Sequence, residues 1–258
     1  MAQRKALRFL MSNGPGSAIQ LSGVSKSYFG QSRVLDQISL EVRRGEFLYV
    51  LGGSGAGKST LFRLISTEEA SSAGQLKLFG YDLKSVNPST LRAIRQAMGY
   101  VPQNIRLIPD LSVQDNIALS LSLAGRRALT ADARTRMGEL MERLALTSVR
   151  DRAAGSISGG EAQRVAVARA LVRNPEIVIA DEPTGMQDRD STWSMMDLLV
   201  RANLGGATVL VATHDHEVVR RVRKRCAQMK AGRLAQIEPE LRTGASPVML
   251  NQESLCIF

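Results

Sequence analysis

The chain has 258 residues, of which 44% are hydrophobic, 22% charged and 4% aromatic. These proportions exclude a chain that is disordered throughout, the length suits one domain with a full core, and the few aromatics disfavour a base-stacking surface. Two cysteines are too few for a disulfide framework or a four-cysteine zinc site. No run of 18 apolar residues occurs and the N-terminus is a poor secretory signal, so we expect a cytoplasmic location without a membrane-spanning helix.

Hydrophobic periodicity divides the chain into a β-rich beginning, a helical block and an alternating β and α end. Residues 1–18 are predicted to be a flexible extension and residues 239–258 a tail. Strands are expected at 19–21, 38–42, 47–51, 75–79, 177–180, 208–212, 227–230 and 234–237. Helices are expected at 61–65, 89–97, 112–123, 130–146, 161–172, 191–203 and 215–223. This order predicts an α/β protein with a buried parallel sheet.

The net charge of +10 is concentrated in two segments. The first 18 residues hold three basic residues, residues 220–233 hold seven, and neither segment contains an acid. A local basic patch can contact anionic lipid headgroups, nucleic acid or an acidic partner. A solvated helix face is the simpler interpretation of 220–225.

A glycine-rich segment lies between the expected strand at 47–51 and the expected helix at 61–65. It fits Gly-x-x-x-x-Gly-Lys-Ser/Thr with Gly52, Gly53, Ser54, Gly55, Ala56, Gly57, Lys58, Ser59 and Thr60. Glycines let backbone N–H groups close on phosphate oxygens, and the positive end of the following helix faces the anion. We expect Lys58 to contact the β- and γ-phosphates and Ser59 to offer its hydroxyl to Mg²⁺. A chance match has odds of about 1%, so the pattern predicts a nucleotide site.

The apolar strand at 177–180 ends in two carboxylates, Asp181 and Glu182. Ligands of parallel sheets lie at this carboxyl edge. Asp181 can hold the hydration shell of Mg²⁺, and Glu182 can polarise or orient the attacking water. A solvated strand end is the alternative, which the nearby phosphate loop makes less favourable.

Residues 156–164 read Ser-Ile-Ser-Gly-Gly-Glu-Ala-Gln-Arg. Within them Ser158, Gly159, Gly160 and Glu161 resemble the signature motif of the ATP-binding cassette (ABC) ATPases. A serine hydroxyl, glycine N–H groups and a helix start again suit an anion. Because the phosphate loop already serves one nucleotide, the resemblance implies that this motif serves the nucleotide of a second subunit.

Four further residues match the motif order of that family. Tyr28 stands where the family places an aromatic that stacks on adenine, and Gln103 matches the glutamine that contacts Mg²⁺ and water. Asp188 matches the D-loop aspartate, and His214 the switch histidine that contacts the γ-phosphate. Taken singly, Tyr28 could be a packed surface aromatic, Gln103 a loop amide and His214 a strand-end histidine. The resemblance covers residues 19–238 and implies an ABC-type nucleotide-binding domain: a P-loop core, an antiparallel β subdomain and a helical insert at about 104–160.

Within the ABC group, residues 106–119 are similar to the FtsE family of cell-division ATP-binding proteins, with Arg106 the most informative position. That resemblance implies an FtsX-like integral membrane partner at the inner membrane, through which ATP-driven motion reaches cell-wall hydrolases. It also implies a head-to-tail homodimer that encloses two ATP molecules and opens on hydrolysis. Two alternatives remain: an export subunit for lipoproteins or small molecules, and an ABC ATPase that acts on nucleic acid or ribosomes, which the few aromatics disfavour.

Overall fold

The structure is a computed structural model that describes residues 16–29, 33–122, 130–185 and 188–238. The expected tail at 239–258 lies outside the described residues, as does the expected extension except for its last three residues. The strands are β1 Ser17–Lys26, β2 Leu35–Arg43, β3 Phe47–Leu51, β4 Ala73–Leu78, β5 Tyr81–Asp82, β6 Met98–Val101, β7 Ile177–Asp181, β8 Thr208–Thr213, β9 Arg225–Lys230 and β10 Arg233–Glu238. The α-helices are α2 Lys58–Ile65, α3 Pro88–Gln96, α4 Val113–Ser122, α5 Ala131–Arg143, α6 Gly159–Leu171, α7 Arg189–Leu204 and α8 His216–Arg221.

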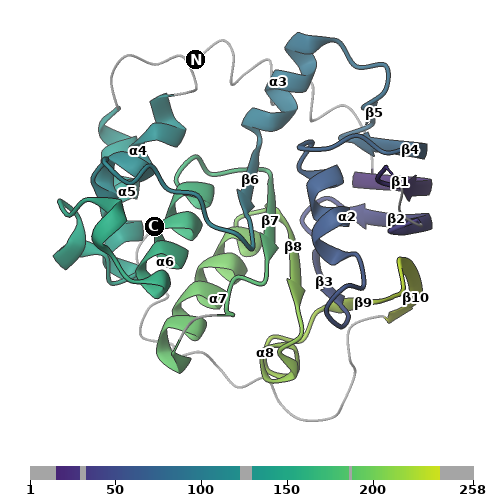
Figure 1. The fold of residues 1–258 in the computed structure, drawn as a ribbon. Helices are drawn as coiled ribbons and strands as arrows, with labels where there is room; N and C mark the ends of the chain where they lie inside the picture. Colours follow the sequence, from purple (N-terminus) through teal and green to yellow (C-terminus); the bar gives the residue numbers. More distant parts are fainter. Residues whose placement is uncertain (1–15, 30–32, 123–129, 186–187, 239–258) are drawn as a thin grey trace.

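Two β-sheets form the framework (Figure 1). A four-stranded sheet runs in the order β2-β1-β4-β5 with antiparallel pairing throughout. A six-stranded sheet runs in the order β10-β9-β3-β8-β7-β6, and all its pairs are parallel except β10 with β9. The α/β class is thereby confirmed, and helix α2 lies between the two sheets (Figure 1).

The central strands are buried on both faces because their alternate side chains enter two different cores. In β3, Phe47 and Tyr49 pack into the core on the helical side, and Leu48 and Val50 pack into the core shared with α2 and the antiparallel sheet. Strands β7 and β8 divide their side chains in the same way. A continuous apolar run is the sequence pattern that this two-sided burial produces.

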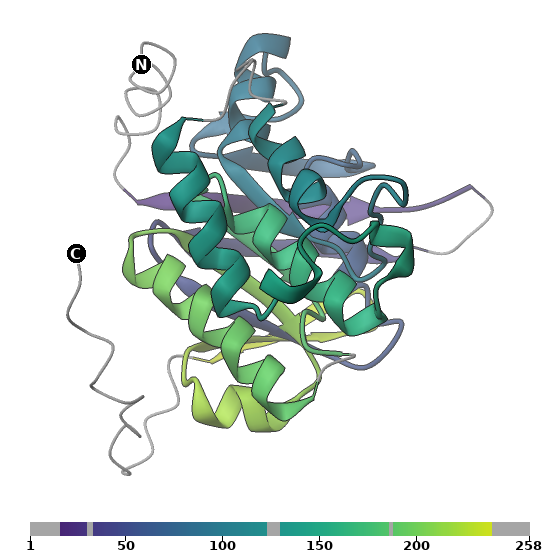
Figure 2. The same cartoon turned by 90° about the vertical axis from the view of Figure 1, so that its left-hand side faces the viewer.

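The helical side carries α4, α5, α6 and α7, which Figure 2 shows from the front. Helix α6 packs on β6 and on the other three helices of this layer. None of the helices in the described residues combines the length and apolar character needed to cross a bilayer.

Several element boundaries differ from the expected ones. Helix α6 begins at Gly159 instead of 161, because the side chain of Ser158 caps it. Strand β6 was not expected, since its four residues, Met98–Val101, include Gly99 and show no long alternation. Gly99 is required there, because a Cβ at this position would lie 2.3 Å from the carbonyl oxygen of Ala170 in α6.

Candidate nucleotide site

The glycine-rich segment joins the carboxyl end of β3 to the first turn of α2. Gly55 and Gly57 have φ values of 75° and 100°, in the left-handed region that side chains disfavour. A Cβ at Gly57 would also lie 2.9 Å from Leu35 Cδ2, so the loop is packed against β2. Gly53 has an open surrounding with no atom within 4 Å of a Cβ. These glycine conformations are compatible with a loop whose backbone N–H groups approach phosphate oxygens.

Lys58 begins α2 and is buried beneath this loop. Its Nζ donates to the carbonyl oxygens of Gly52 at 2.7 Å and Gly53 at 3.2 Å. It also lies 3.4 Å from Glu182 Oε1. The ammonium group is thus held by oxygen atoms at the place where phosphate oxygens would compete for it.

Three oxygen-bearing side chains that the sequence assigned to Mg²⁺ come together at the ends of α2, β6 and β7. Ser59 Oγ lies 3.3 Å from Gln103 Oε1, and the Ser59 side chain also acts on the pKa of the Asp181 carboxyl. Burial raises the pKa of Asp181, as does the charge of Glu182, while Ser59 and Lys58 oppose the shift. Asp181 is 1% exposed and its Oδ1 has no hydrogen-bond partner among the described residues. A buried oxygen without a partner, beside a hydroxyl and an amide oxygen, fits Mg²⁺ shared with substrate phosphates.

Glu182 turns its carboxylate toward both Lys58 and the end of the neighbouring strand. Its Oε2 lies 2.9 Å from Nδ1 of His214, which follows β8. Its φ is 51°, which is strained for a residue with a side chain. The peptide N–H of Glu182 donates to the carbonyl oxygen of Ala212 at 3.0 Å, which fixes this turn on β8. Such strain at a carboxylate that faces a lysine and a histidine is typical of a reacting group.

The signature residues lie at the start of α6, where Ser158 and Gly159 are exposed. Ser158 caps the helix and forms a capping box with Glu161, whose N–H donates to Ser158 Oγ at 3.2 Å. The N–H of Ser158 donates to Glu161 Oε2 at 2.7 Å, and this bond is the main reason that the pKa of Glu161 is lowered. Ser158, Gly159 and Gly160 thus lie at a helix N-terminus, a position whose backbone N–H groups favour an anion.

Asp188 caps α7 through its carboxylate, which accepts from Ser191 N at 2.9 Å and from Ser191 Oγ at 2.6 Å. The Ser191 side chain is the main cause of the lowered pKa of Asp188. Arg164 of α6 lies 3.3 Å from Ser191 Oγ. The signature helix and the start of α7 are thus joined through one serine.

Tyr28 follows β1, and its hydroxyl donates to Glu69 Oε2 at 2.6 Å. The side chain is half-buried. No sequence pattern predicts the role of Glu69, because its partners Lys26 and Tyr28 come from a distant part of the chain. Tyr28 is 41 residues away along the chain. For Arg63 the sequence offers a weaker indication of a contact with the phosphate loop, because it stands one helical turn after Ser59.

The basic segment at 220–233 is partly compensated within the chain. Arg225 pairs with Glu46 at 2.5 Å, and Arg233 pairs with Asp36. Arg221 stacks over Trp193 at 4.3 Å from the ring centroid. The acidic partners Glu46 and Asp36 lie outside the segment. Counting the charges within the segment alone therefore overstates its unpaired positive charge.

The family model described as ABC transporter matches residues 35–185. The match covers more than half of the chain, so the chain belongs to this family. Among solved structures, a dimeric bacterial ABC transporter cassette superposes with a TM-score of 0.79 and 33% identity, over 87% of this chain and 99% of that one. A dimeric post-hydrolysis state with ADP and Pi matches equally well. The chain is therefore an ATP-binding cassette that hydrolyses ATP.

Two groups of curated relatives are similar over most of the chain. The cell division ATP-binding protein FtsE of Mycobacterium tuberculosis is 39% identical over 85% of this chain and 95% of the relative. The methionine import ATP-binding protein MetN of Caulobacter vibrioides is 41% identical over 84% of this chain and 66% of the relative. The relatives establish the ATPase class and leave the partner to be argued.

Proposed function

We propose that the chain is the ATPase subunit of an FtsEX-like complex at the cytoplasmic face of the inner membrane. ATP-driven dimerisation acts on an FtsX-like integral membrane protein that regulates cell-wall hydrolysis during division. FtsE relatives from Mycobacterium tuberculosis, Streptococcus pneumoniae and Bacillus subtilis support this assignment, with 36–39% identity. The observation that carries the coupling is the way in which the segment after Gln103 is bonded to the segment before Ser158.

Backbone hydrogen bonds join these two segments side by side. Leu111 O accepts from Ala154 N at 2.9 Å, and Pro109 O accepts from Gly155 N at 2.9 Å. Further along, the N–H of Val113 donates to Arg152 O at 3.0 Å. A membrane partner that docks on residues 104–122 would therefore pull on the chain only a few residues before the signature motif.

Two side chains reinforce this connection. Asn116 is fully buried, and its amide bonds both the N–H and the carbonyl of Ile108, at 2.8 and 3.0 Å. Arg169 of the signature helix donates to the carbonyl oxygen of Arg106 at 2.8 Å. Burial lowers the pKa of Arg169. These contacts make α4, the loop before it and α6 one mechanical unit.

In the proposed cycle, the loop at Gly52–Thr60 binds the triphosphate of ATP and Lys58 exchanges its carbonyl partners for phosphate oxygens. Ser158, Gly159 and Gly160 of a second copy close over the same γ-phosphate, and Asp188 lies at the seam. Two such contacts form a head-to-tail homodimer. The dimeric cassettes among the structural neighbours support this arrangement.

In this cycle Glu182 orients the attacking water and accepts its proton, and Gln103 and His214 complete the site. Ser59, Asp181 and Gln103 would hold Mg²⁺, which when bound neutralises charge on the β- and γ-phosphate oxygens. Within the described residues no group of three or more histidine, cysteine, aspartate or glutamate side chains is arranged to hold a metal ion. The single carboxylate is consistent with an ion that binds together with ATP.

A second candidate function is an ATPase of a small-molecule transporter, which the MetN relatives favour. Contact of the basic segment at 220–233 with anionic lipid is a subsidiary part of the main proposal. Arg220 and Lys230 are exposed there, whereas Arg225 and Arg233 have acidic partners.

Affinity isolation from detergent-solubilised membranes tests the assignment. The full chain is captured with ATP or without nucleotide, and integral proteins are identified by mass spectrometry. An FtsX-like protein in the eluate, together with a division defect on depletion of the chain, supports the proposal. A solute permease in its place, with ATPase activity that responds to methionine, would replace it with the transporter function.

A further inference from the structure

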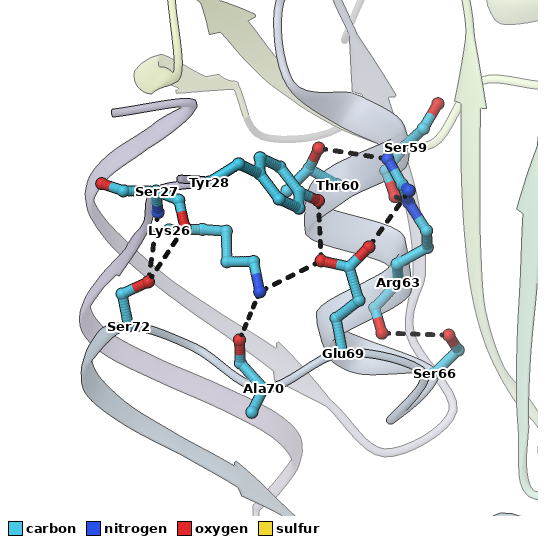
Figure 3. A network of polar contacts seen from close by, with 10 residues as sticks. All are labelled: Lys26, Ser27, Tyr28, Ser59, Thr60, Arg63, Ser66, Glu69, Ala70 and Ser72. Carbon is cyan, nitrogen blue, oxygen red and sulfur yellow. Dashed lines mark hydrogen bonds and ion pairs between the residues drawn. The ribbon is translucent and has the colours of Figure 1, made fainter. Parts of the chain in front are cut away.

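The carboxylate of Glu69 binds three donors from two separate parts of the chain (Figure 3). Glu69 follows α2 in the connection to β4. Its Oε2 accepts the Tyr28 hydroxyl at 2.6 Å and lies 3.1 Å from Lys26 Nζ. Its Oε1 lies 3.0 Å from Arg63 Nη1. We call these four residues the Glu69 cluster.

One side of the cluster fixes the ring of Tyr28. Lys26 Nζ lies 5.0 Å from the centroid of that ring, which is within the range of a cation–π contact. Lys26 also donates to the carbonyl oxygen of Ala70 at 2.9 Å. The ring is thus held at its hydroxyl by Glu69 and beside one face by an ammonium group that Glu69 and Ala70 position.

The other side of the cluster reaches the phosphate loop. Arg63 Nε lies 3.4 Å from the carbonyl oxygen of Ser59, and Arg63 Nη2 lies 3.4 Å from Thr60 Oγ1. Ser59 and Thr60 are the last residues of the phosphate-loop pattern. Glu69 therefore links the aromatic ring to the first turn of α2 through one carboxylate.

The backbone around the cluster is also connected. Ser72 N donates to the carbonyl oxygen of Ser25 at 2.9 Å, and Ser27 N donates to Ser72 Oγ at 3.1 Å. These bonds join the end of β1 to the loop that contains Glu69. The cluster thus rests on two segments whose relative position is already set by the main chain.

Glu69 is held in its charged form. Partial burial raises the pKa of its carboxyl, but the hydrogen bonds from Tyr28 and Lys26 and the charge of Arg63 outweigh burial, so the pKa lies below its ordinary value. At 21% exposure the side chain is mostly shielded from water. A charged acceptor with three donors is a strong and directional fixing point.

We propose that Glu69 is a positioning residue for the nucleotide base: it holds Tyr28 at a set spacing from the phosphate loop, so that the base and the triphosphate of ATP bind together. This inference rests on the stacking role that the family resemblance implies for Tyr28 and is independent of the membrane partner. The gain comes from pre-organisation, because a ring already in place loses little freedom when the base stacks on it.

The test compares ATP with inorganic triphosphate, which lacks the base, in the variant Glu69→Gln. Loss of the charge should weaken ATP binding by about three- to tenfold, as expected for one charge-assisted contact. Binding of triphosphate and kcat should change by less than about twofold, so the effect appears in KM. Isothermal titration and steady-state ATPase assays measure these quantities. Equal weakening of both ligands, or no weakening of ATP, would overturn the inference.

Matched variants separate the possible causes. Glu68→Gln removes an exposed neighbouring carboxylate that acts on Arg63 and Glu69 only through its charge, so binding of both ligands should change by less than about twofold. Tyr28→Ala should weaken the binding of ATP and leave the binding of triphosphate unchanged. If it does not, Tyr28 does not stack on the base and the positioning role of Glu69 is wrong as well. If only Glu69→Gln is without effect, stacking stands and the positioning role fails. Tyr28→Phe removes just the hydroxyl and should give the ATP-specific loss even if Glu69→Gln does not fold.

Discussion

The phosphate end of the site, with Lys58, Asp181 and Glu182, differs from the signature motif in whether a single chain brings its functional groups together. At the phosphate end, Lys58 and Asp181 are buried, and they meet Glu182 where β3, β7 and β8 end side by side. Asp181 Oδ1 lacks a partner among the described residues, and Lys58 is bonded to exchangeable carbonyls. In contrast, Ser158 is exposed and satisfied by its own helix through Glu161.

This difference indicates which half of the chemistry needs a second copy. Buried polar groups with unfilled bonding capacity raise the free energy of the empty site and favour a ligand that satisfies them. An exposed, self-satisfied helix start gains little by itself and contributes only when another surface brings the anion to it. ATP binding should therefore be a property of one chain, and hydrolysis a property of two.

The largest effect is expected from Glu182→Gln, which tests the buried half. Without a carboxylate to accept a proton, the rate of ATP hydrolysis should fall at least about 100-fold while ATP binding is retained. The unhydrolysed ATP should then hold two copies together, which gel filtration with ATP can detect. Phosphate release measures the rate.

Glu176→Gln is the matched control, because Glu176 is exposed at the opposite end of β7. This control should hydrolyse ATP at the unmodified rate. Unchanged hydrolysis in Glu182→Gln would remove Glu182 from the reaction and with it the contrast between the two halves.

A smaller but still large effect is expected at Asn116, which supports the signature half. Asn116→Leu leaves Ile108 N without its 2.8 Å acceptor and removes donors to the carbonyls of Ile108 and Ser112, both at 3.0 Å. The free energy of unfolding should fall by about 2–3 kcal/mol, the cost of buried groups left unpaired. Urea denaturation measures this change. An unaltered unfolding midpoint would show that the loop before α4 does not depend on this amide.

A moderate effect is expected from Ser158→Ala in the signature motif. The change removes the helix cap and the hydroxyl offered to a second copy, and ATPase activity should fall about tenfold, consistent with one lost hydrogen bond to a charged group. ATP binding by a single chain should remain. Binding titrations and ATPase assays at rising protein concentration separate the two.

Ser112→Ala provides a matched control, because Ser112 also accepts from a backbone N–H three residues on, at 3.0 Å from Asp115. Both variants should lose a comparable capping contribution of about 1 kcal/mol. Only the Ser158 variant should lose dimer-dependent hydrolysis. Equal losses in the two would mean that the hydroxyl of Ser158 acts on its own helix alone.

The sequence predicted best what lies in one contiguous segment or at the end of an apolar strand. The phosphate loop carries its glycines, lysine and hydroxyl within nine residues, Gly52–Thr60, so its local geometry can be inferred without the rest of the fold. The carboxylates after β7 follow from a parallel sheet, because all such strands end at one edge. Asp181 is the last residue of β7, and His214 directly follows the neighbouring strand β8.

The remainder depends on contacts between distant segments. Glu69 shows no local sequence pattern, since its partner Tyr28 is 41 residues away and is brought near by the pairing of β1 with β4 and by the bonds of Ser72. The sequence predicts that this helix starts at 161, but α6 begins at Gly159, where the capping box of Ser158 and Glu161 overrides the low helix propensity of glycine. Helix propensity describes a single residue, whereas the start of α6 is determined by the hydrogen bonds between two side chains and the backbone.

The smallest effect is expected from Glu217→Gln. This variant tests whether an exposed ion pair near the site matters for hydrolysis as much as the buried residues of the phosphate end do. Glu217 pairs with Arg189 at 2.6 Å, joining the first turns of α7 and α8 beside Asp188 and His214. The two side chains are 57% and 72% exposed, whereas Glu182 is 11% exposed. Water screens the exposed pair, so its loss should change the free energy of unfolding by less than about 0.5 kcal/mol.

ATPase activity of Glu217→Gln should likewise stay within about twofold, because a screened pair contributes little to the position of either helix. Urea denaturation and phosphate release measure both quantities. A fall in hydrolysis of tenfold or more without a fall in stability would contradict the idea that the buried residues of the phosphate end determine hydrolysis and exposed pairs do not. Such a result would mean that the exposed pair transmits the position of α7 to His214. The signature motif would then act on the phosphate end through surface contacts rather than through bound ATP.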